Sequence, residues 1–147
     1  MSDLKIKFKI VTPERTVYEE DIEQATLPAL SGQITILPNH RSYIGALKAG
    51  EIMIKQAGQE INLAISSGLV EFNQNTLVIL ADTAEQATEI DIARAEATAR
   101  ERAEAVKKEK TIMSEQEYAR VAASIEKELV RIKVARKHHT KHGITIN

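Results

Sequence analysis

The chain has 147 residues, of which 43% are hydrophobic and 28% charged, and its formal net charge is −1. This length suits one ordinary domain or two small ones. The near-neutral charge argues against a nucleic-acid-binding protein, which needs a basic surface. The absence of Cys excludes disulfides and thiolate metal sites. No apolar signal core and no stretch of about 18 apolar residues is present, so we expect membrane association only through a partner.

The first 81 residues show the period of β-strands. Between Leu4 and Ile10 every second residue is apolar, and the residues between them are lysines. Turn residues recur about every 8–12 positions, which is typical of a β-sandwich or barrel. Residues 52–54 are expected to face residues 61–65 across a turn at 56–59. The expected strands are 4–11, 15–19, 22–27, 33–37, 43–47, 51–56, 60–66, 68–72 and 76–81.

From Ile90 onward the sequence has a helical period, with no Gly or Pro before Gly143. A capping box at residues 83–86 offers one helix start. Asp91 offers another as an N-cap, because its carboxylate can accept hydrogen bonds from free backbone N–H groups, and we favour this start. The helix is expected to run to about Lys108. Its expected inner face comprises Ile92, Ala95, Ala99, Ala103 and Val106.

A second helix is expected after a turn at residues 109–113. Ser114 and Glu117 form a capping box at its start, and basic residues fill its far end. The short connection favours an antiparallel pair of helices. The expected apolar stripe of this helix has the narrow spacing of a coiled coil. It comprises Tyr118, Ala122, Ile125, Leu129 and Ile132.

The expected fold is therefore β + α, an N-terminal antiparallel β-sandwich followed by a C-terminal antiparallel helical hairpin. The expected boundaries are 1–84 for the sandwich, 85–90 for a linker, 91–140 for the hairpin and 141–147 for a tail. A hairpin with an alanine-rich face gains little from its own contacts, because a core of fewer than about 70 residues hardly exceeds the entropy cost of ordering. We expect it to dock on the sandwich, a ligand or another protein, and to exchange between such positions.

Charge is unevenly distributed along the chain. Residues 1–82 carry 7 Lys/Arg and 10 Asp/Glu, whereas residues 83–147 carry 13 and 11. After Glu128 every charged residue is basic. This end is either a solvated helix terminus, whose cations suit the helix dipole, or a cationic tip that meets an acidic surface.

Enzyme signatures are scarce, and we expect no catalytic residue and no metal site. There is no G-x-S-x-G, no H-E-x-x-H and no glycine-rich phosphate loop. His40 is a lone loop histidine, which we interpret as structural. His138 and His142 have a spacing that can hold Zn²⁺ on a helix, but Gly143 argues against it. The acidic run 19–21 is interpreted as a solvated edge.

Six short segments, in order along the chain, resemble the epsilon subunit of F-type ATP synthases. The similarity extends from about Leu4 to about Arg136. The segments are VTPER at 11–15, ILPNH at 36–40, ALKAG at 46–50, SSGLVE at 66–71, ADTAE at 81–85 and IDIARA at 90–95.

The resemblance implies a non-catalytic subunit of the central stalk of a proton-translocating ATP synthase. In that family the sandwich binds the gamma subunit and rests on the c-ring, so that it couples ring rotation to catalysis. In many bacterial members the hairpin is mobile, and when extended it reaches the alpha/beta catalytic hexamer and inhibits ATP hydrolysis. The implied location is the cytoplasmic face of the bacterial inner membrane, as a peripheral part of F1.

In some members of the family the docked hairpin binds ATP through an Ile/Leu-Asp-x-x-Arg-Ala motif. The resemblance implies that ATP is a regulatory ligand here, and no cofactor is required. The alternative is that Asp91 is a plain N-cap, Arg94 pairs with acidic neighbours and no ligand binds. Lys127 stands where an Arg is expected, so the forked geometry of a guanidinium is lost there. The implied ATP residues are Glu85, Ile90, Asp91, Arg94, Lys127 and Arg131.

The loop that faces the c-ring departs from the family pattern. The family reads Gly-Glu-Leu-Gly-Ile, whereas this chain reads GQITI at 32–36. The acidic residue is absent, which leaves Gln33 to form hydrogen bonds. The implied contacts with the c-ring or the gamma subunit are Ser31, Gly32, Gln33 and His40.

Two other functions compete with a rotor subunit. One is a freestanding ATP-responsive binding module of the same fold, outside any synthase. The other is a small enzyme that uses His40 and nearby carboxylates, which no visible nucleophile–base pair supports.

Overall fold

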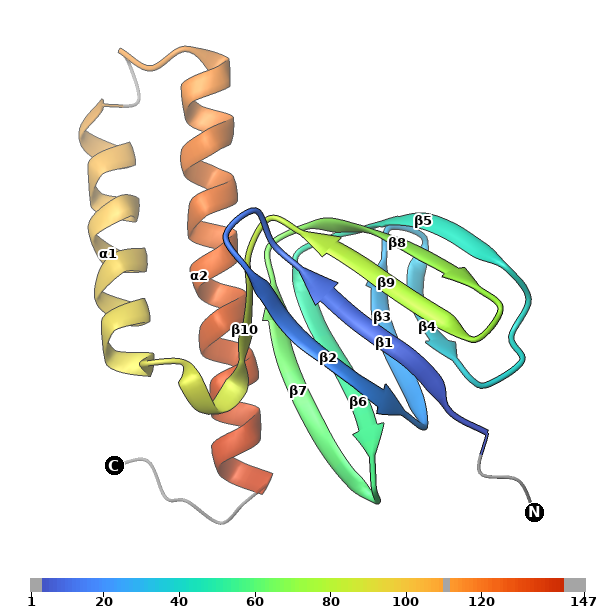
Figure 1. Ribbon diagram of the computed structural model, residues 1–147. Helices are drawn as coiled ribbons and strands as arrows, with labels where there is room; N and C mark the ends of the chain where they lie inside the picture. Colours follow the sequence, from blue (N-terminus) through green and yellow to red (C-terminus); the bar gives the residue numbers. More distant parts are fainter. Residues whose placement is uncertain (1–3, 110–111, 142–147) are drawn as a thin grey trace.

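The computed structural model describes residues 4–109 and 112–141, which form a β-sandwich followed by two helices (Figure 1). The strands are β1 (Ile6–Val11), β2 (Thr16–Ile22), β3 (Gln24–Ala29), β4 (Gly32–Ile36), β5 (Tyr43–Leu47), β6 (Gly50–Gln56), β7 (Gln59–Ile65), β8 (Gly68–Asn73), β9 (Thr76–Ala81) and β10 (Ala84–Gln86). A 3-10 turn, η1 (Ala87–Glu89), leads to α1 (Ile92–Glu109) and α2 (Glu115–Lys141). The expected fold class is confirmed.

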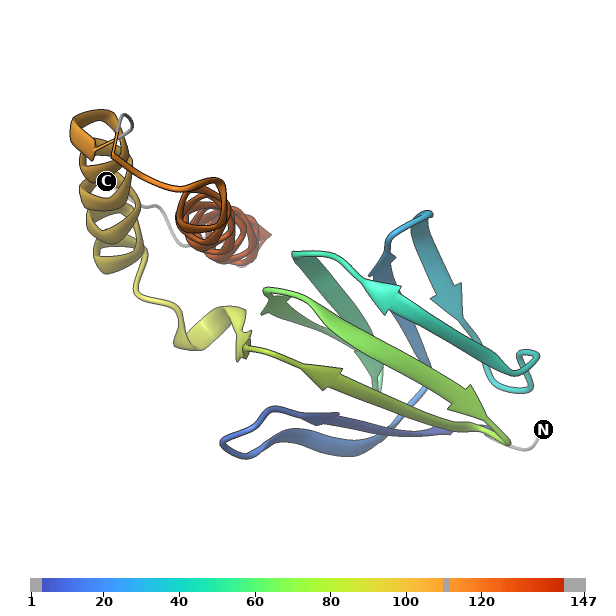
Figure 2. The ribbon, with the colours of Figure 1, turned by 90° about the horizontal axis from the view of Figure 1, so that it is seen from above.

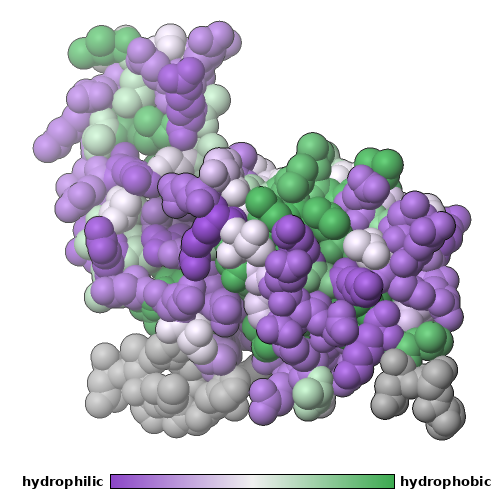
Figure 3. Space-filling model, viewed as in Figure 1, coloured by the Kyte–Doolittle hydropathy of each residue, from purple (hydrophilic) through white to green (hydrophobic). Residues whose placement is uncertain are grey.

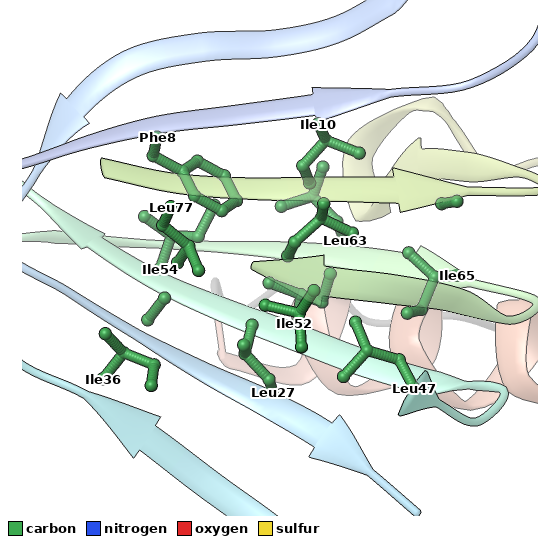
Figure 4. Packing of buried hydrophobic residues seen from close by; sticks show 14 of the residues in the cluster. Phe8, Ile10, Leu27, Ile36, Leu47, Ile52, Ile54, Leu63, Ile65 and Leu77 are labelled. Carbon is green, nitrogen blue, oxygen red and sulfur yellow. The ribbon is translucent and has the colours of Figure 1, made fainter. Parts of the chain in front are cut away.

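The ten strands form one continuous sheet that folds over on itself. The strand order is β10-β7-β6-β3-β5-β8-β9-β1-β2, with β4 paired to β3. Alternate residues of β1 and β8 are buried, as expected when one face of a strand points into a core. Large aliphatic and aromatic side chains from both layers fill this core (Figure 4). Those without measurable exposure include Ile6, Ile10, Ile22, Leu27, Ile36, Ile52, Ile54, Leu63, Leu77 and Ile79.

The sheet contains one described parallel strand pair, β1 with β9, which the sequence did not indicate. β1 pairs with β2 in antiparallel fashion and with β9 in parallel fashion. Lys7 and Lys9 of β1 stand opposite Asp21 and Glu19 of the edge strand β2. Charged edge strands resist pairing with other chains. The acidic run 19–21 is therefore an exposed edge, as its sequence indicated.

The hairpin registers follow from their turns. β6 and β7 pair with Ile52 opposite Leu63 and Ile54 opposite Ile61, which confirms the predicted facing rows. The two turn residues Ala57 and Gly58 have φ of 51° and 76°. Positive φ at both positions gives a turn whose twist matches that of the strands.

The short strand β10 was not expected, because three residues are too few to show a period. It pairs with the free edge of β7, with Ala84 opposite Ile65 and Gln86 opposite Leu63. The segment 85–90, expected as a linker, thus begins in the sheet and continues as η1. Thr83 does not start a helix, since its N–H donates to Ser66 Oγ at 3.2 Å.

Both helix starts are set by side-chain caps. The Arg94 N–H donates to Asp91 Oδ1 at 3.0 Å, which confirms Asp91 as the N-cap of α1. At α2 the Glu117 N–H donates to Ser114 Oγ at 3.2 Å, and the Ser114 N–H donates to Glu117 Oε2 at 3.4 Å. The predicted capping box is therefore present.

The contact between α1 and α2 follows the prediction on one helix only. Ala95 and Ala99 are the buried residues of α1, as expected. On α2 the predicted stripe is wrong in part, because Tyr118, Ala122 and Leu129 are exposed. The less exposed residues of α2 include Val121, Ser124, Ile125, Glu128 and Ile132.

Polar groups account for this shift of the α2 face. Arg102 of α1 donates hydrogen bonds to the hydroxyl and the carbonyl of Ser124 and pairs with Glu128, at 3.5 Å from Oε1. The small alanine side chains of α1 leave room for these longer side chains between the helices. The hairpin contact is therefore partly ionic rather than an apolar seam.

α2 lies between α1 and the sandwich in two perpendicular views (Figures 1 and 2). The end of α2 packs on β7 and η1 through a small cluster, here called the hinge cluster. The upper part of the hairpin extends past the sandwich (Figure 1). Neither helix, over the described residues, has the length and apolar character needed to cross a membrane. The hinge cluster consists of Ala64, Ala87, Ile90, Val134 and Ala135.

The sandwich core should dominate the stability of the fold. Ile54→Ala removes a side chain with no exposure from β6 and should lower the free energy of unfolding by about 2–5 kcal/mol. Ile44→Ala in β5, where the side chain is 78% exposed, should change it by less than about 0.5 kcal/mol. Urea unfolding followed by circular dichroism measures both values. Equal losses for the two variants would contradict the proposed core.

Candidate functional site

A polar cleft of about 350 Å³ opens between the sandwich and α2. The turn between β1 and β2, the connection from β9 to β10, and the middle of α2 form its walls. Glu85, Lys127 and Arg131, three of the residues implied for ATP, lie in this lining together. The full lining is Thr12, Glu14, Arg15, Asp82, Thr83, Ala84, Glu85, Lys127 and Arg131.

Arg131 joins the hairpin to the sandwich within this cleft. Its Nε donates to Glu85 Oε2 at 2.5 Å and its Nη2 donates to Glu85 Oε1 at 3.0 Å, which is a bidentate pair. Its Nη1 donates to Glu128 Oε2 at 2.6 Å. Burial opposes the charged form of Arg131, but hydrogen bonds and attraction from Glu85 and Glu128 outweigh it and raise its pKa. Arg131 is therefore a fixed cation at the floor of the cleft.

Two further cations, Lys127 and Arg15, line the cleft and have fewer ionic contacts than Arg131. Lys127 forms no ion pair among the described residues. Arg15, in the turn between β1 and β2, has Glu89 as its ion-pair partner at 3.9 Å. Arg15 lies in the segment VTPER, which the sequence marked without a function for this residue. Its role depends on a chain turn that brings it beside α2, which no local pattern reveals.

Three of the residues implied for ATP lie outside this lining. Ile90 is 5% exposed and belongs to the hinge cluster, so it packs rather than presents a group to a ligand. Asp91 caps α1, as described above. Arg94 is exposed, and its guanidinium forms no hydrogen bond or ion pair among the described residues. The structure thus divides the implied set into a cleft group and a helix-start group.

The residues implied for contact with the c-ring or the gamma subunit also divide. Ser31, Gly32 and Gln33 form the turn into β4, whereas His40 follows the other end of this strand. Five strand residues span about 13 Å, so the two groups do not make one site. The His40 ring packs edge-on against the Phe72 ring, with 5.9 Å between the ring centroids. Its Nδ1–H donates to the Arg41 carbonyl at 2.7 Å. Its contacts fit the structural interpretation made from the sequence.

An apolar row crosses the outer face of the sandwich. The registers place Ala46 of β5 beside Leu69 of β8, Leu69 beside Leu80 of β9, and Leu80 beside Val11 of β1. Leu69 is 58% exposed and Leu80 is 53% exposed. Ile44 lies two residues from Ala46 on the same face and is more exposed still. Figure 3 shows the hydrophobic surface over β5, β8 and β9.

The sequence contained these residues but did not single them out as a surface. Val11, Leu69 and Leu80 each alternate with buried neighbours and read as ordinary strand residues. Leu69 and Leu80 are aligned by the antiparallel pairing of β8 with β9, and Val11 joins them through the parallel pairing of β1 with β9.

No group of three or more His, Asp or Glu with metal-binding geometry occurs among the described residues. His138 lies in α2 near β7, in the lining of a pocket with Asn62 and Ala87. His142, its proposed partner in a Zn²⁺ pair, lies outside the described residues.

Comparisons with known proteins place this chain in a family. The model of the β-sandwich domain of the ATP synthase delta/epsilon chain matches residues 5–87. An ATP synthase epsilon chain from Dehalococcoides mccartyi is 41% identical over 138 residues, which cover 94% of this chain and 96% of that protein. The epsilon chain from Geobacter sulfurreducens is 36% identical and covers 90% and 95%. The chain belongs to the family of ATP synthase epsilon chains.

Solved structures share the same two-part fold. A chain of the Euglena gracilis mitochondrial ATP synthase, in an assembly of OSCP, F1 and c-ring, aligns with a TM-score of 0.70 at 18% identity. The alignment covers 92% of this chain and 82% of that one. A chain of the Tetrahymena thermophila mitochondrial ATP synthase central stalk and c-ring aligns with a TM-score of 0.59 at 14% identity, covering 92% and 99%.

Proposed function

We propose that this chain is the epsilon subunit of a proton-translocating ATP synthase, where it acts in the central stalk without catalysing a reaction itself. The single observation that carries the proposal is the family membership over nearly the whole chain. In this role the sandwich turns with the gamma subunit and the c-ring, and the hairpin regulates ATP hydrolysis by the alpha/beta hexamer. The proposed location is peripheral, on the cytoplasmic face of the bacterial inner membrane.

The apolar row is the proposed docking surface for the gamma subunit. Exposed apolar patches that span several strands are typical of protein interfaces. The row defined by Val11, Ala46, Leu69 and Leu80 is continuous, and Ile44 extends it. Its strands belong to the rigid sandwich, so a partner seated here would be held in a fixed orientation, as torque transmission requires. The turn 31–33 is the proposed contact with the c-ring, through hydrogen bonds of Gln33.

The docked hairpin contains an internal cost that favours a mobile role. Lys137 of α2 donates to Glu51 Oε2 of β6 at 3.1 Å, but Glu51 Oε1 is buried without a hydrogen-bond partner. A buried unpaired acceptor costs about 1–3 kcal/mol. The hinge cluster that offsets this cost consists of three alanines with one Ile and one Val, and so buries little apolar area. The attachment of the docked hairpin to the sandwich therefore depends on few apolar contacts.

Substitution within the apolar row tests the docking surface. Leu69→Glu places a charge in its centre and should weaken association with the gamma subunit by at least about 30-fold, because central apolar contacts contribute about 2 kcal/mol or more. Lys55→Glu, an exposed change on β6 in the other layer, should leave association unchanged. Copurification of tagged variants with the synthase from membranes, followed by titration with gamma, measures both.

The same purification distinguishes a synthase subunit from a freestanding ATP-responsive module. If the tagged wild-type chain recovers no synthase subunit, the freestanding ATP-responsive module is favoured instead. If Lys55→Glu weakens association as much as Leu69→Glu, the gamma surface lies elsewhere.

Deletion of the second helix tests the inhibitory role. Removal of residues from Lys110 onward takes away α2 and leaves the sandwich, so assembly should persist and ATP hydrolysis by the complex should rise. Removal of residues 142–147 alone is the control and should leave hydrolysis unchanged. Hydrolysis is measured on the purified complex at low ATP. An unchanged rate after the longer deletion would exclude inhibition by the hairpin.

We also propose that the cleft binds the phosphates of a regulatory ATP. Cations from two sides, Arg15 on the sandwich and Lys127 with Arg131 on the hairpin, line one opening of a suitable size. Charge-assisted hydrogen bonds from these groups to phosphate would hold the hairpin against the sandwich. ATP would then favour the docked position, since a ligand stabilises the state it binds. Arg94 at the start of α1 is the proposed further contact.

Calorimetric titration with Mg-free ATP tests this site. Lys127→Gln should lower the affinity about tenfold or more, because a hydrogen bond to a charged group contributes about 1.5–3 kcal/mol. Lys133→Gln, an exposed change on the same helix outside the cleft, should have no effect. If Arg94→Ala abolishes binding while Lys127→Gln does not change it, the ligand sits at the start of α1. No heat with the wild-type chain would exclude the site.

A further inference from the structure

Glu128 is the only charged residue that is buried among the described residues, with 4% exposure. It sits on α2 between two arginines of different origin. Arg102 approaches from α1, at 3.5 Å from Glu128 Oε1. Arg131, one turn along α2, donates to Glu128 Oε2 at 2.6 Å. A buried carboxylate is tolerated only when it is paired and hydrogen-bonded, so both arginines are needed where they stand.

The chain of contacts continues from Arg131 onto the sandwich. The two other nitrogens of this guanidinium, Nε and Nη2, form the bidentate pair with Glu85 of β10. The resulting series, Arg102–Glu128–Arg131–Glu85, passes from α1 through α2 to the sheet without a gap. It is here called the charge chain. Its middle pair lies within one helix, and its two ends lie on separate elements.

Two further ion pairs of α2 lie near the charge chain. Arg136 of α2 pairs with Glu96 of α1 and so joins the helices to each other. Lys137 of α2 pairs with Glu51 of β6 and so joins the hairpin to the sandwich. In the charge chain, the contact with α1 and the contact with the sandwich are linked to each other by an ion pair within α2, Glu128–Arg131.

We propose that the charge chain couples the closing of the hairpin to its docking, so that α1–α2 contact and α2–sandwich contact form and break together. The geometry explains the direction of the effect. Arg102 neutralises and orients Glu128, and Glu128 fixes the Arg131 guanidinium so that its other edge faces Glu85. Loss of Arg102 leaves Glu128 underpaired, and it then draws Arg131 out of register with Glu85. A hairpin that opens at α1 therefore loses its attachment to the sandwich.

The coupling concerns the isolated chain and does not depend on inhibition or on ATP. It has a consequence for the hairpin as a switch. Independent contacts would allow a closed hairpin to swing away from the sandwich, or a docked α2 to lose α1. Coupled contacts leave two main states, one closed and docked and the other open and released. Bistability of this kind turns a small bias into a large change of population.

Paired spin labels on the full chain test the proposal, since the chain has no Cys of its own. A docking pair is made by Glu71→Cys on β8 with Ala119→Cys on α2. A closing pair is made by Glu104→Cys on α1 with Ala119→Cys. Distance distributions for each pair give the ratio of docked to released and of closed to open molecules. Both sets of labels occupy exposed positions away from the charge chain.

Arg102→Gln and Glu96→Gln each break one ion pair between the helices, and Arg102→Gln also removes the hydrogen bonds of Arg102 to Ser124. Arg102→Gln should lower the docked-to-released ratio by about tenfold, as expected when a buried charge loses a partner. Glu96→Gln should leave this ratio within about twofold of wild type, because exposed pairs contribute little. Equal effects of the two variants on docking, or no effect of Arg102→Gln, would overturn the proposal.

The reverse direction is tested from the sandwich. Glu85→Gln should lower the closed-to-open ratio of the hairpin about tenfold, although Glu85 does not belong to either helix. Glu51→Gln, which breaks the other docking pair, should leave the closing ratio unchanged. If Arg102→Gln prevents helix formation, as circular dichroism would show, Glu85→Gln decides the question. A closing ratio that is unchanged in Glu85→Gln would refute the coupling.

Discussion

The hairpin contacts the sandwich through the C-terminal half of one helix, α2, and the proposed regulatory role depends on this limited attachment. The hinge cluster is mostly alanine, and the ionic contacts beside it involve a buried carboxylate. Neither kind of contact supplies much net free energy, because small side chains bury little area and buried charges lose their hydration. What these contacts supply is geometry. They define where α2 lies on the sandwich.

The sandwich has the opposite character. Isoleucines, leucines and phenylalanines from both layers form one core, and every strand is paired on at least one side. In the proposed role, the subunit needs one body that does not deform and one element that can change its position. The chain meets these needs with separate chemistry. Large aliphatic side chains form the core of the sandwich, and alanines with ion pairs form the attachment of the hairpin.

Much of the fold could be predicted because its signals are local. Strand alternation, the turn at Ala57–Gly58, and the caps at Asp91 and Ser114 each involve residues close in sequence, and each is present. The parallel pairing of β1 with β9 and the short strand β10 depend on contacts between distant segments, which leave no period. The α2 stripe was predicted wrongly at Tyr118, Ala122 and Leu129. Apolar spacing alone cannot foresee that Glu128 is buried when two arginines accompany it.

The candidate site was predictable only in part for the same reason. Glu85, Lys127 and Arg131 were identified through the family resemblance, and they meet in one cleft. Arg15 lies in the turn between β1 and β2, more than a hundred residues before Lys127 and Arg131 in the sequence. The apolar row likewise needs four strands in register before it exists as a surface. Surfaces that are assembled from distant strands carry no motif, and only the folded chain displays them.

The position of β1 has a consequence for biosynthesis. Its antiparallel neighbour β2 leaves the ribosome directly after it, but its parallel neighbour β9 is made only when the sandwich sequence is almost complete. Until then one edge of β1 stays open, and the β1–β2 hairpin cannot pair with the rest of the sheet. Non-local strand pairing of this kind delays folding. The residues on which α2 packs, in β7, η1 and at Ile90, all precede α2 in the chain. This packing surface can therefore form before α2 has been translated.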